Sequence, residues 1–234
     1  MFYQFKDCYI KYENSILTIG NNIIERQISL ENGIPACVYL KNVTTGYEFR
    51  SLEDKKCVLF GIPGFDFASS LVSVYAYTDD RNGFSNNACV AEVHFEKENR
   101  AVYAYFRIYP DCGFINTTLS LDGVFGTGVD AKVCKEEYED YIVAENQDIE
   151  AVGFCNEHAK IHTAELVDFT DVHNNVVKKS CELMYLSHWH NPFKGQFFIL
   201  DAYVENEAFM LVKEAPCAFG RFADSEYDAA PRQG

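Results

Sequence analysis

The sequence predicts an all-β fold in which two antiparallel sheets pack face to face. Apolar and polar residues alternate over many short segments, and this period of two is typical of half-buried strands. Glycine and asparagine fall between the segments at hairpin spacing, where tight turns need positive φ angles. Aromatic residues make up 15% of the chain, and they pack well on a pleated surface. Many strands with short connections therefore predict a large antiparallel sandwich.

The first half of the chain supplies the clearest strands. Asn32 and Gly33 form a hairpin signal, residues 44–46 contain a second turn, and residues 97–99 join two long alternating segments. The strands expected here are 16–20, 23–30, 34–43, 71–77, 88–96, 100–109 and 114–121.

The second half continues the same pattern with fewer clear segments. Residues 132–145 have a brief helical period, but their acidic centre indicates a solvated loop. We expect fourteen to seventeen strands in all, and the later ones are 159–169, 181–187, 194–201 and 208–212. Since no repeat or flexible linker divides the chain, we expect a single domain over residues 1–220, followed by a polar tail at 221–234.

The charge and cysteine content narrow the classes of partner and compartment. The net charge of −15 argues against nucleic acid and anionic membranes, which attract basic surfaces. It suits a neutral ligand such as a sugar, although solubility alone explains it equally well. The nine cysteines form no C-x-x-C pair, so they indicate reduced thiols, or four disulfides and one spare thiol. No signal peptide or membrane-spanning run is visible. The sequence does not identify the cellular compartment of the protein, although its scattered cysteines favour the cytoplasm.

No motif predicts a cofactor or a bound metal. The glycines of 61–64 and 123–128 are not followed by the helix that a phosphate-binding loop needs. His188 and His190 share one strand face, and Glu182 or Asp201 could complete a metal site with them. Surface histidines beside a loop are the more ordinary interpretation.

A catalytic acid and base are equally hard to identify. Sugar mutarotases use a histidine and a glutamate on either side of a saccharide. His188 or His190 with Glu205 or Glu207 could fill those roles, but the local sequence contexts of that family are absent. The G-x-S-x-G pattern of a serine nucleophile is absent as well.

Aromatic side chains are the remaining candidates for a binding surface. Sugars stack their C–H faces on exposed tryptophan and tyrosine rings. In the strand 100–109 the apolar residues alternate with Tyr103, Tyr105, Arg107 and Tyr109, which therefore share the other face. The alternative is that this tyrosine row packs against a second layer or another domain. The candidate carbohydrate-binding residues are Trp189, His188, His190, Tyr103 and Tyr105.

Three segments together resemble the N-terminal domain of glycoside hydrolase family 36, the α-galactosidase family. Residues 14–21, Asn-Ser-Ile-Leu-Thr-Ile-Gly-Asn, resemble its opening hairpins, as do Ile24-Glu25-Arg26 and Thr45-Gly46-Tyr47-Glu48-Phe49. Residues 164–174 resemble its segment ending in Thr-Asp-x-His-Asn. Residues 194–198, followed by Lys213-Glu214-Ala215-Pro216, resemble the strands that precede its barrel.

The resemblance implies a β-supersandwich of the galactose mutarotase-like type, followed by a (β/α)₈ catalytic barrel beyond residue 234. In that family two barrel aspartates perform retaining hydrolysis. Neither of their sequence contexts occurs in this chain, so no catalytic residue is carried over. The implied role is a non-catalytic domain that buttresses the barrel and contributes to carbohydrate binding or to a homo-oligomer. The alternatives are a separate carbohydrate-binding module and a mutarotase or epimerase acting on a free sugar.

Overall fold

The computed structural model confirms the all-β fold. It describes residues 1–50, 59, 65–79, 87–123, 159–168, 175–183 and 197–212. The chain divides into two compact units, Met1–Phe154 and Cys155–Gln233, and each is described by itself. The single domain over residues 1–220 and the supersandwich arrangement stay predictions.

The first unit begins with a six-stranded antiparallel sheet in which every strand pairs with the next one along the chain. The turn between its fourth and fifth strands contains Asn32 and Gly33, with φ angles of 55° and 82°, so the predicted hairpin turn is confirmed. The strands are β1 (Phe2–Phe5), β2 (Cys8–Glu13), β3 (Ile16–Gly20), β4 (Ile24–Ser29), β5 (Ala36–Asn42) and β6 (Glu48–Arg50).

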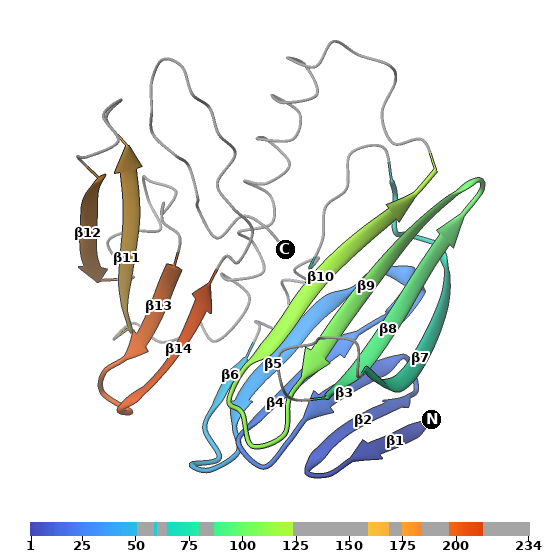
Figure 1. Ribbon diagram of the computed structural model, residues 1–234, viewed down its shortest axis with the longest axis horizontal. Helices are drawn as coiled ribbons and strands as arrows, with labels where there is room; N and C mark the ends of the chain where they lie inside the picture. The colour runs from blue at the N-terminus through green and yellow to red at the C-terminus, as the bar shows by residue number, and fades with distance from the viewer. Residues whose placement is uncertain are drawn as a thin grey trace. The chain divides into compact units, whose positions relative to one another are not determined.

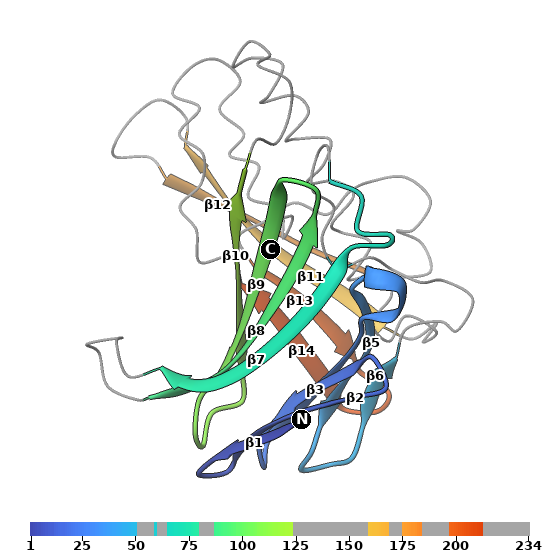
Figure 2. The ribbon, with the colours of Figure 1, turned by 90° about the vertical axis from the view of Figure 1, so that its right-hand side faces the viewer.

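A second antiparallel sheet of four strands completes the described part of this unit. Its strands are β7 (Leu71–Asp79), β8 (Ala88–Lys97), β9 (Arg100–Ile108) and β10 (Ile115–Asp122), in the order β10-β9-β8-β7. Figures 1 and 2 show the two sheets as adjoining layers, and β1, β2 and β3 contact β7, β8 and β9 respectively.

The core lies between these two layers. The side of β9 that the alternation predicts to be apolar is buried. Its four side chains, Val102, Ala104, Phe106 and Ile108, are each at most 1% exposed. Burying an aliphatic or aromatic side chain of this size contributes about 1.5–3 kcal/mol to folding. The largest buried side chains of the unit are Phe95, Phe106, Ile10, Leu17, Ile19, Ile28, Ile108, Val90, Val93 and Val102.

The Asn21 side chain joins the two sheets at one end of the core. It is only 1% exposed and follows β3 directly. Its Oδ1 accepts hydrogen bonds from the backbone N–H groups of Ile23 and Ile24, at 2.8 and 3.0 Å. Its Nδ2 donates to the carbonyls of Tyr109 and Cys112, at 3.0 and 2.7 Å. These four bonds use the full capacity of a primary amide, so the turn after β3 is fixed to the turn after β9.

A different contact joins the sheets at the opposite end. Gly33 has a φ of +82°, and a Cβ atom there would lie 2.4 Å from the Phe67 carbonyl oxygen. The backbone of Ser69 also donates to the Asn32 carbonyl at 2.9 Å. Only glycine allows this close approach at such a φ angle.

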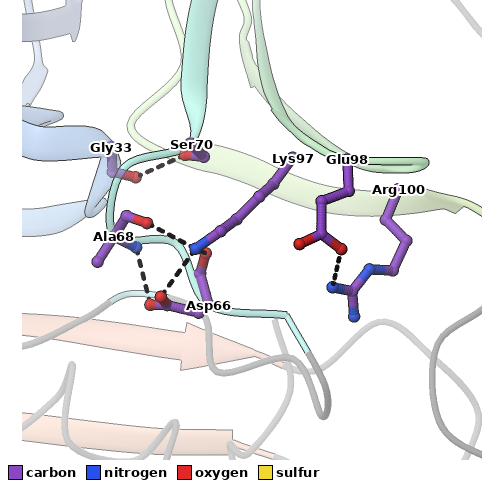
Figure 3. Close-up of polar contacts among 7 residues, drawn as sticks. All are labelled: Gly33, Asp66, Ala68, Ser70, Lys97, Glu98 and Arg100. Atoms are coloured by element: carbon purple, nitrogen blue, oxygen red, sulfur yellow. Dashed lines mark hydrogen bonds and ion pairs between the residues drawn. The ribbon is translucent and has the colours of Figure 1, made fainter.

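Lys97 holds the same turn onto the β8–β9 hairpin (Figure 3). Its Nζ donates to the Asp66 carboxylate at 2.8 Å and to the Ala68 carbonyl at 2.9 Å. Phe67 adds an edge-to-face contact with Phe95, with ring centroids 5.1 Å apart. The turn therefore has both a polar and an aromatic anchor on the second sheet.

The second unit contains a four-stranded antiparallel sheet in the order β12-β11-β13-β14. Leu200 and Ala202 of β13 are buried, at 0% and 1% exposure. The strands are β11 (Ala159–Asp168), β12 (Asn175–Leu183), β13 (Phe197–Ala202) and β14 (Glu207–Val212).

Most expected strands are found within a few residues of the expected bounds, and one is displaced. β12 begins at Asn175, six residues before the expected start at Cys181. Because its pairing with β11 runs from Asp168↔Asn175 to Lys160↔Leu183, the partner strand decides where β12 begins. Residues 184–187, like the expected loop at 132–145 and the tail at 221–234, lie outside the described residues.

Loss of the Asn21 amide should destabilise the fold strongly. Replacing Asn21 with alanine leaves two carbonyls and two N–H groups without their partner. Each group that water cannot reach costs about 1–3 kcal/mol, and Ile23 is 38% exposed, so fewer than four groups carry that cost. We expect Asn21→Ala to lower the free energy of unfolding by about 3 kcal/mol, measured by urea denaturation. The exposed neighbour Asn22 is the control, because Asn22→Ala should change it by less than about 0.5 kcal/mol. Equal effects of the two substitutions would contradict the role given to Asn21.

Candidate functional site

The side of the β7–β10 sheet that points away from the core carries aromatic and charged residues. Strand pairing places them on one surface, since β7, β8 and β9 are antiparallel neighbours in continuous register. Their positions alternate with those of the core face, as a strand requires. Val90, which is paired with Tyr77 and Arg107, lies on the same face but is fully buried. This surface, called the aromatic face below, consists of Tyr75, Tyr77, Glu92, His94, Tyr103, Tyr105 and Arg107.

One cross-strand row places a carboxylate between two phenols. Glu92 of β8 is paired with Tyr75 of β7 on one side and with Tyr105 of β9 on the other. Tyr105 is in turn paired with Thr118 of β10. Neighbouring strands lie about 4.8 Å apart, so the side chains of Tyr75 and Tyr105 begin on either side of the Glu92 side chain.

His94 links this row to the next one along the strands. Its ring centroid lies 4.8 Å from that of Tyr75 and 4.6 Å from that of Tyr103. Its Nε2 lies 2.7 Å from Oε1 of Glu92. The imidazole is therefore held by two rings and one carboxylate, which gives the centre of the face a defined arrangement.

Two phenols of the face have raised pKa values. Burial, followed by the hydrogen bond that it donates to Glu92 and the negative charge of that carboxylate, raises the pKa of Tyr77 to about 12. Burial and the charge of Glu92 also raise the pKa of Tyr105. Both shifts have Glu92 among their causes, so its charge acts on the tyrosines around it.

Arg107 borders the face on β9. Its Nη1 donates to Oγ1 of Thr118 at 2.7 Å, and its Nε lies 4.0 Å from Oδ2 of Asp79. Its guanidinium also lies over the Tyr105 ring, 5.2 Å from the centroid, which is a cation–π distance. These three contacts orient both the guanidinium and the Tyr105 ring.

The face is accessible at its centre. Tyr75 is 50% exposed, and the Glu92 and His94 side chains are each 20% exposed. The exposed hydroxyls of Thr118 and Ser120 lie on the adjoining strand, in register with Tyr105 and Tyr103. The surface can therefore offer a ring for stacking together with several hydrogen-bonding groups.

The structure brings together two of the five predicted carbohydrate-binding residues. Tyr103 and Tyr105 both lie on the aromatic face, whereas Trp189, His188 and His190 lie outside the described residues. Tyr109, expected in the same row, instead pairs its ring with Phe114 at 5.3 Å.

Sequence reasoning missed Tyr75, Glu92 and His94 as members of the face. The hairpin at 97–99 sets β8 against β9 in a fixed register. That register could have predicted that Glu92 and His94 lie beside the tyrosines of β9. The pairing of Tyr75 depends on β7 meeting β8, and no short turn joins those two strands.

Other polar clusters have structural explanations. A shallow hollow beside the β8–β9 hairpin is lined by Phe65, Asp66, Lys97, Glu98 and Arg100. Its charged groups pair with one another, Lys97 with Asp66 and Arg100 with Glu98 (Figure 3). The hollow therefore anchors a turn instead of offering charge to a ligand.

The outer face of the six-stranded sheet holds a second pair of phenols. Tyr9 and Tyr39 both donate to the Glu25 carboxylate, and burial followed by this hydrogen bond raises the pKa of each phenol. A Cβ atom at Gly20 would lie 2.7 Å from the Tyr9 hydroxyl, so glycine leaves the space for that ring to cross β3. The two phenols and the Glu25 carboxylate therefore satisfy one another's hydrogen-bonding groups.

In the second unit, His162 Nε2 lies 3.3 Å from Asp201 Oδ2. Glu207, expected as a catalytic base, is 9% exposed, whereas Glu205 is exposed. Across the described residues, no group of three His, Cys, Asp or Glu side chains is arranged to hold a metal ion.

No protein-family model matches this sequence, and no curated protein matches it either. The aromatic face is therefore interpreted from its own chemistry. In the parts of the chain that the structure describes, no helix is long and apolar enough to span a membrane.

The raised pKa of Tyr77 has a consequence for stability at high pH. The unfolded phenol titrates near pH 10, whereas the folded one titrates at about pH 12. The stability that Tyr77 contributes is therefore complete below pH 10 and is lost as the pH rises towards 12. Tyr77→Phe should be less stable than the wild type at pH 8, and this difference should shrink between pH 10 and 12. Urea denaturation of both proteins measures this difference in stability, and a constant difference would show that folding does not raise the pKa of Tyr77.

Proposed function

We propose that this chain binds carbohydrate through the aromatic face, as a non-catalytic β-sandwich domain of an α-galactosidase-like glycoside hydrolase. The observation that carries the proposal is the row Tyr75–Glu92–Tyr105–Thr118, which places stacking rings beside hydrogen-bonding groups on one accessible surface. The resemblance of three segments to glycoside hydrolase family 36 supports the same class of ligand.

The chemistry of a pyranose ring fits this row. One side of the sugar presents C–H groups that pack on an aromatic ring, and its rim presents hydroxyls that need polar partners. Tyr75 is the most exposed ring of the face, so it is the stacking residue. Glu92 can accept from sugar hydroxyls, and the Thr118 hydroxyl and Arg107 guanidinium can donate to them.

The arrangement of His94 and Glu92 supports binding in preference to catalysis. A mutarotase needs its acid and base on opposite sides of the sugar, and a retaining glycosidase separates its two carboxyl groups by about 5–5.5 Å. His94 and Glu92 lie 2.7 Å apart and bond each other. A sugar cannot fit between them.

Buttressing of a catalytic barrel is the second role proposed for the domain. Leu71 on β7 is 66% exposed and Leu121 on β10 is 49% exposed. Both lie at the end of the sheet that carries the β8–β9 hairpin. Leu71 lies on the aromatic face and Leu121 on the core face, so the two do not form one patch. The resemblance to glycoside hydrolase family 36 is what supports this second role.

Removal of the stacking ring should weaken sugar binding. We expect the protein to bind galactose-containing oligosaccharides with a millimolar Kd, and Tyr75→Ala to raise that Kd about tenfold, since a stacking contact of this kind contributes about 1–1.5 kcal/mol. Isothermal titration calorimetry measures both. Tyr203→Ala is the control, because Tyr203 is similarly exposed, at 41%, but lies in the second unit.

Two results would contradict the proposal. Absence of binding at about 10 mM sugar would remove carbohydrate recognition, since that concentration exceeds a millimolar Kd. Accelerated anomer interconversion in polarimetry, lost in His94→Asn, would replace a binding role with a catalytic one.

A further inference from the structure

We propose that the aromatic face prefers sugars that carry a free amino group, with Glu92 as the residue that selects the positive charge. The inference rests on the proposed carbohydrate-binding function and narrows its ligand to cationic, unacetylated amino sugars.

Glu92 has the surroundings that recognise a cation. Tyr75 and Tyr105 are its cross-strand partners on either side, and the rings of Tyr75 and Tyr103 pack on His94, which bonds the Glu92 carboxylate. Aromatic rings attract positive charge through their electron-rich faces. A carboxylate between such rings adds a direct ionic hydrogen bond to the same ligand group.

The Glu92 carboxylate also has acceptor capacity left for a ligand. Two carboxylate oxygens offer about four acceptor positions. The His94 imidazole and the Tyr77 hydroxyl occupy two of them. At 20% exposure, the carboxylate can be reached from solvent.

The charges of the face favour a cation over an anion. Arg107 lies over the Tyr105 ring, and it is also engaged by Thr118 and Asp79. Glu92 and Asp79 place two carboxylates around Arg107, and Glu92 also bonds the His94 imidazole. The whole chain has a net charge of −15, which attracts cationic ligands at long range and repels acidic sugars.

Three sugars that differ only at C2 test the inference. Galactosamine carries an ammonium group there, galactose a hydroxyl, and N-acetylgalactosamine a neutral amide. We expect the whole chain to bind galactosamine about tenfold more tightly than the other two at about pH 7 and low salt, because a cation–π contact and one ion pair each contribute modestly. Isothermal titration calorimetry or ligand-observed NMR measures the three Kd values. The preference should fall at high salt, where exposed charges are screened.

A matched pair of substitutions assigns the preference to Glu92. Glu92→Gln keeps the shape of the side chain and removes its charge, so the three Kd values should become similar. Glu96 lies on the same strand and the same face, but Leu71 and Ala101 are paired with it. Glu96→Gln removes the same charge from the chain and should leave the preference unchanged.

The outcomes separate the inference from the function on which it rests. Equal binding of all three sugars would overturn the amine preference and leave carbohydrate binding standing. A preference that survives in Glu92→Gln would also overturn it, because the attraction would then come from the overall charge. Binding of none of the sugars would overturn both.

Discussion

The arrangement of the first unit depends on one buried side chain, the amide of Asn21. Its four hydrogen bonds fix the turn after β3 to the turn after β9, and the close contact of Gly33 with Phe67 fixes the opposite end. Apolar packing alone is non-directional, so these polar contacts set the position of one sheet on the other. The alternation of β9 decides which of its sides is apolar, and these contacts hold the packing in which the Val102–Ile108 side is buried and the tyrosine side points outward.

The proposed binding surface follows from that constraint. Once one side of β7–β10 packs on the six-stranded sheet, strict alternation places Tyr75, Glu92 and Tyr105 on the other side in a single row. The contacts of His94 and Arg107 then hold the rings and the carboxylate in place. A surface arranged in this way before a ligand arrives loses less conformational entropy on binding, which is the physical basis for assigning recognition to this face.

The sequence predicted the all-β class, the turn at Asn32 and Gly33, and the two faces of β9, because period-two alternation and turn residues are local signals. It also placed Tyr103 and Tyr105 on a candidate surface. It could not predict that Glu92 lies between Tyr75 and Tyr105, because this depends on the register between β7 and β8. Residues 80–87 connect these strands, and a connection of this length does not fix a register from sequence alone. The start of β12 was misplaced for a similar reason, since its register with β11 decides it. The hydrogen bonds of Asn21 join turns about 90 residues apart in the sequence, and no local sequence pattern predicts such a contact.

The most direct test of the account is an NMR titration of the whole chain with an amino sugar, following the backbone amide signals of all assigned residues. If the aromatic face is the binding surface, the largest shifts will map to β7, β8 and β9 around Tyr75, Glu92 and Tyr105. Shifts confined to other parts of the chain, such as the segment containing Trp189, would contradict the account.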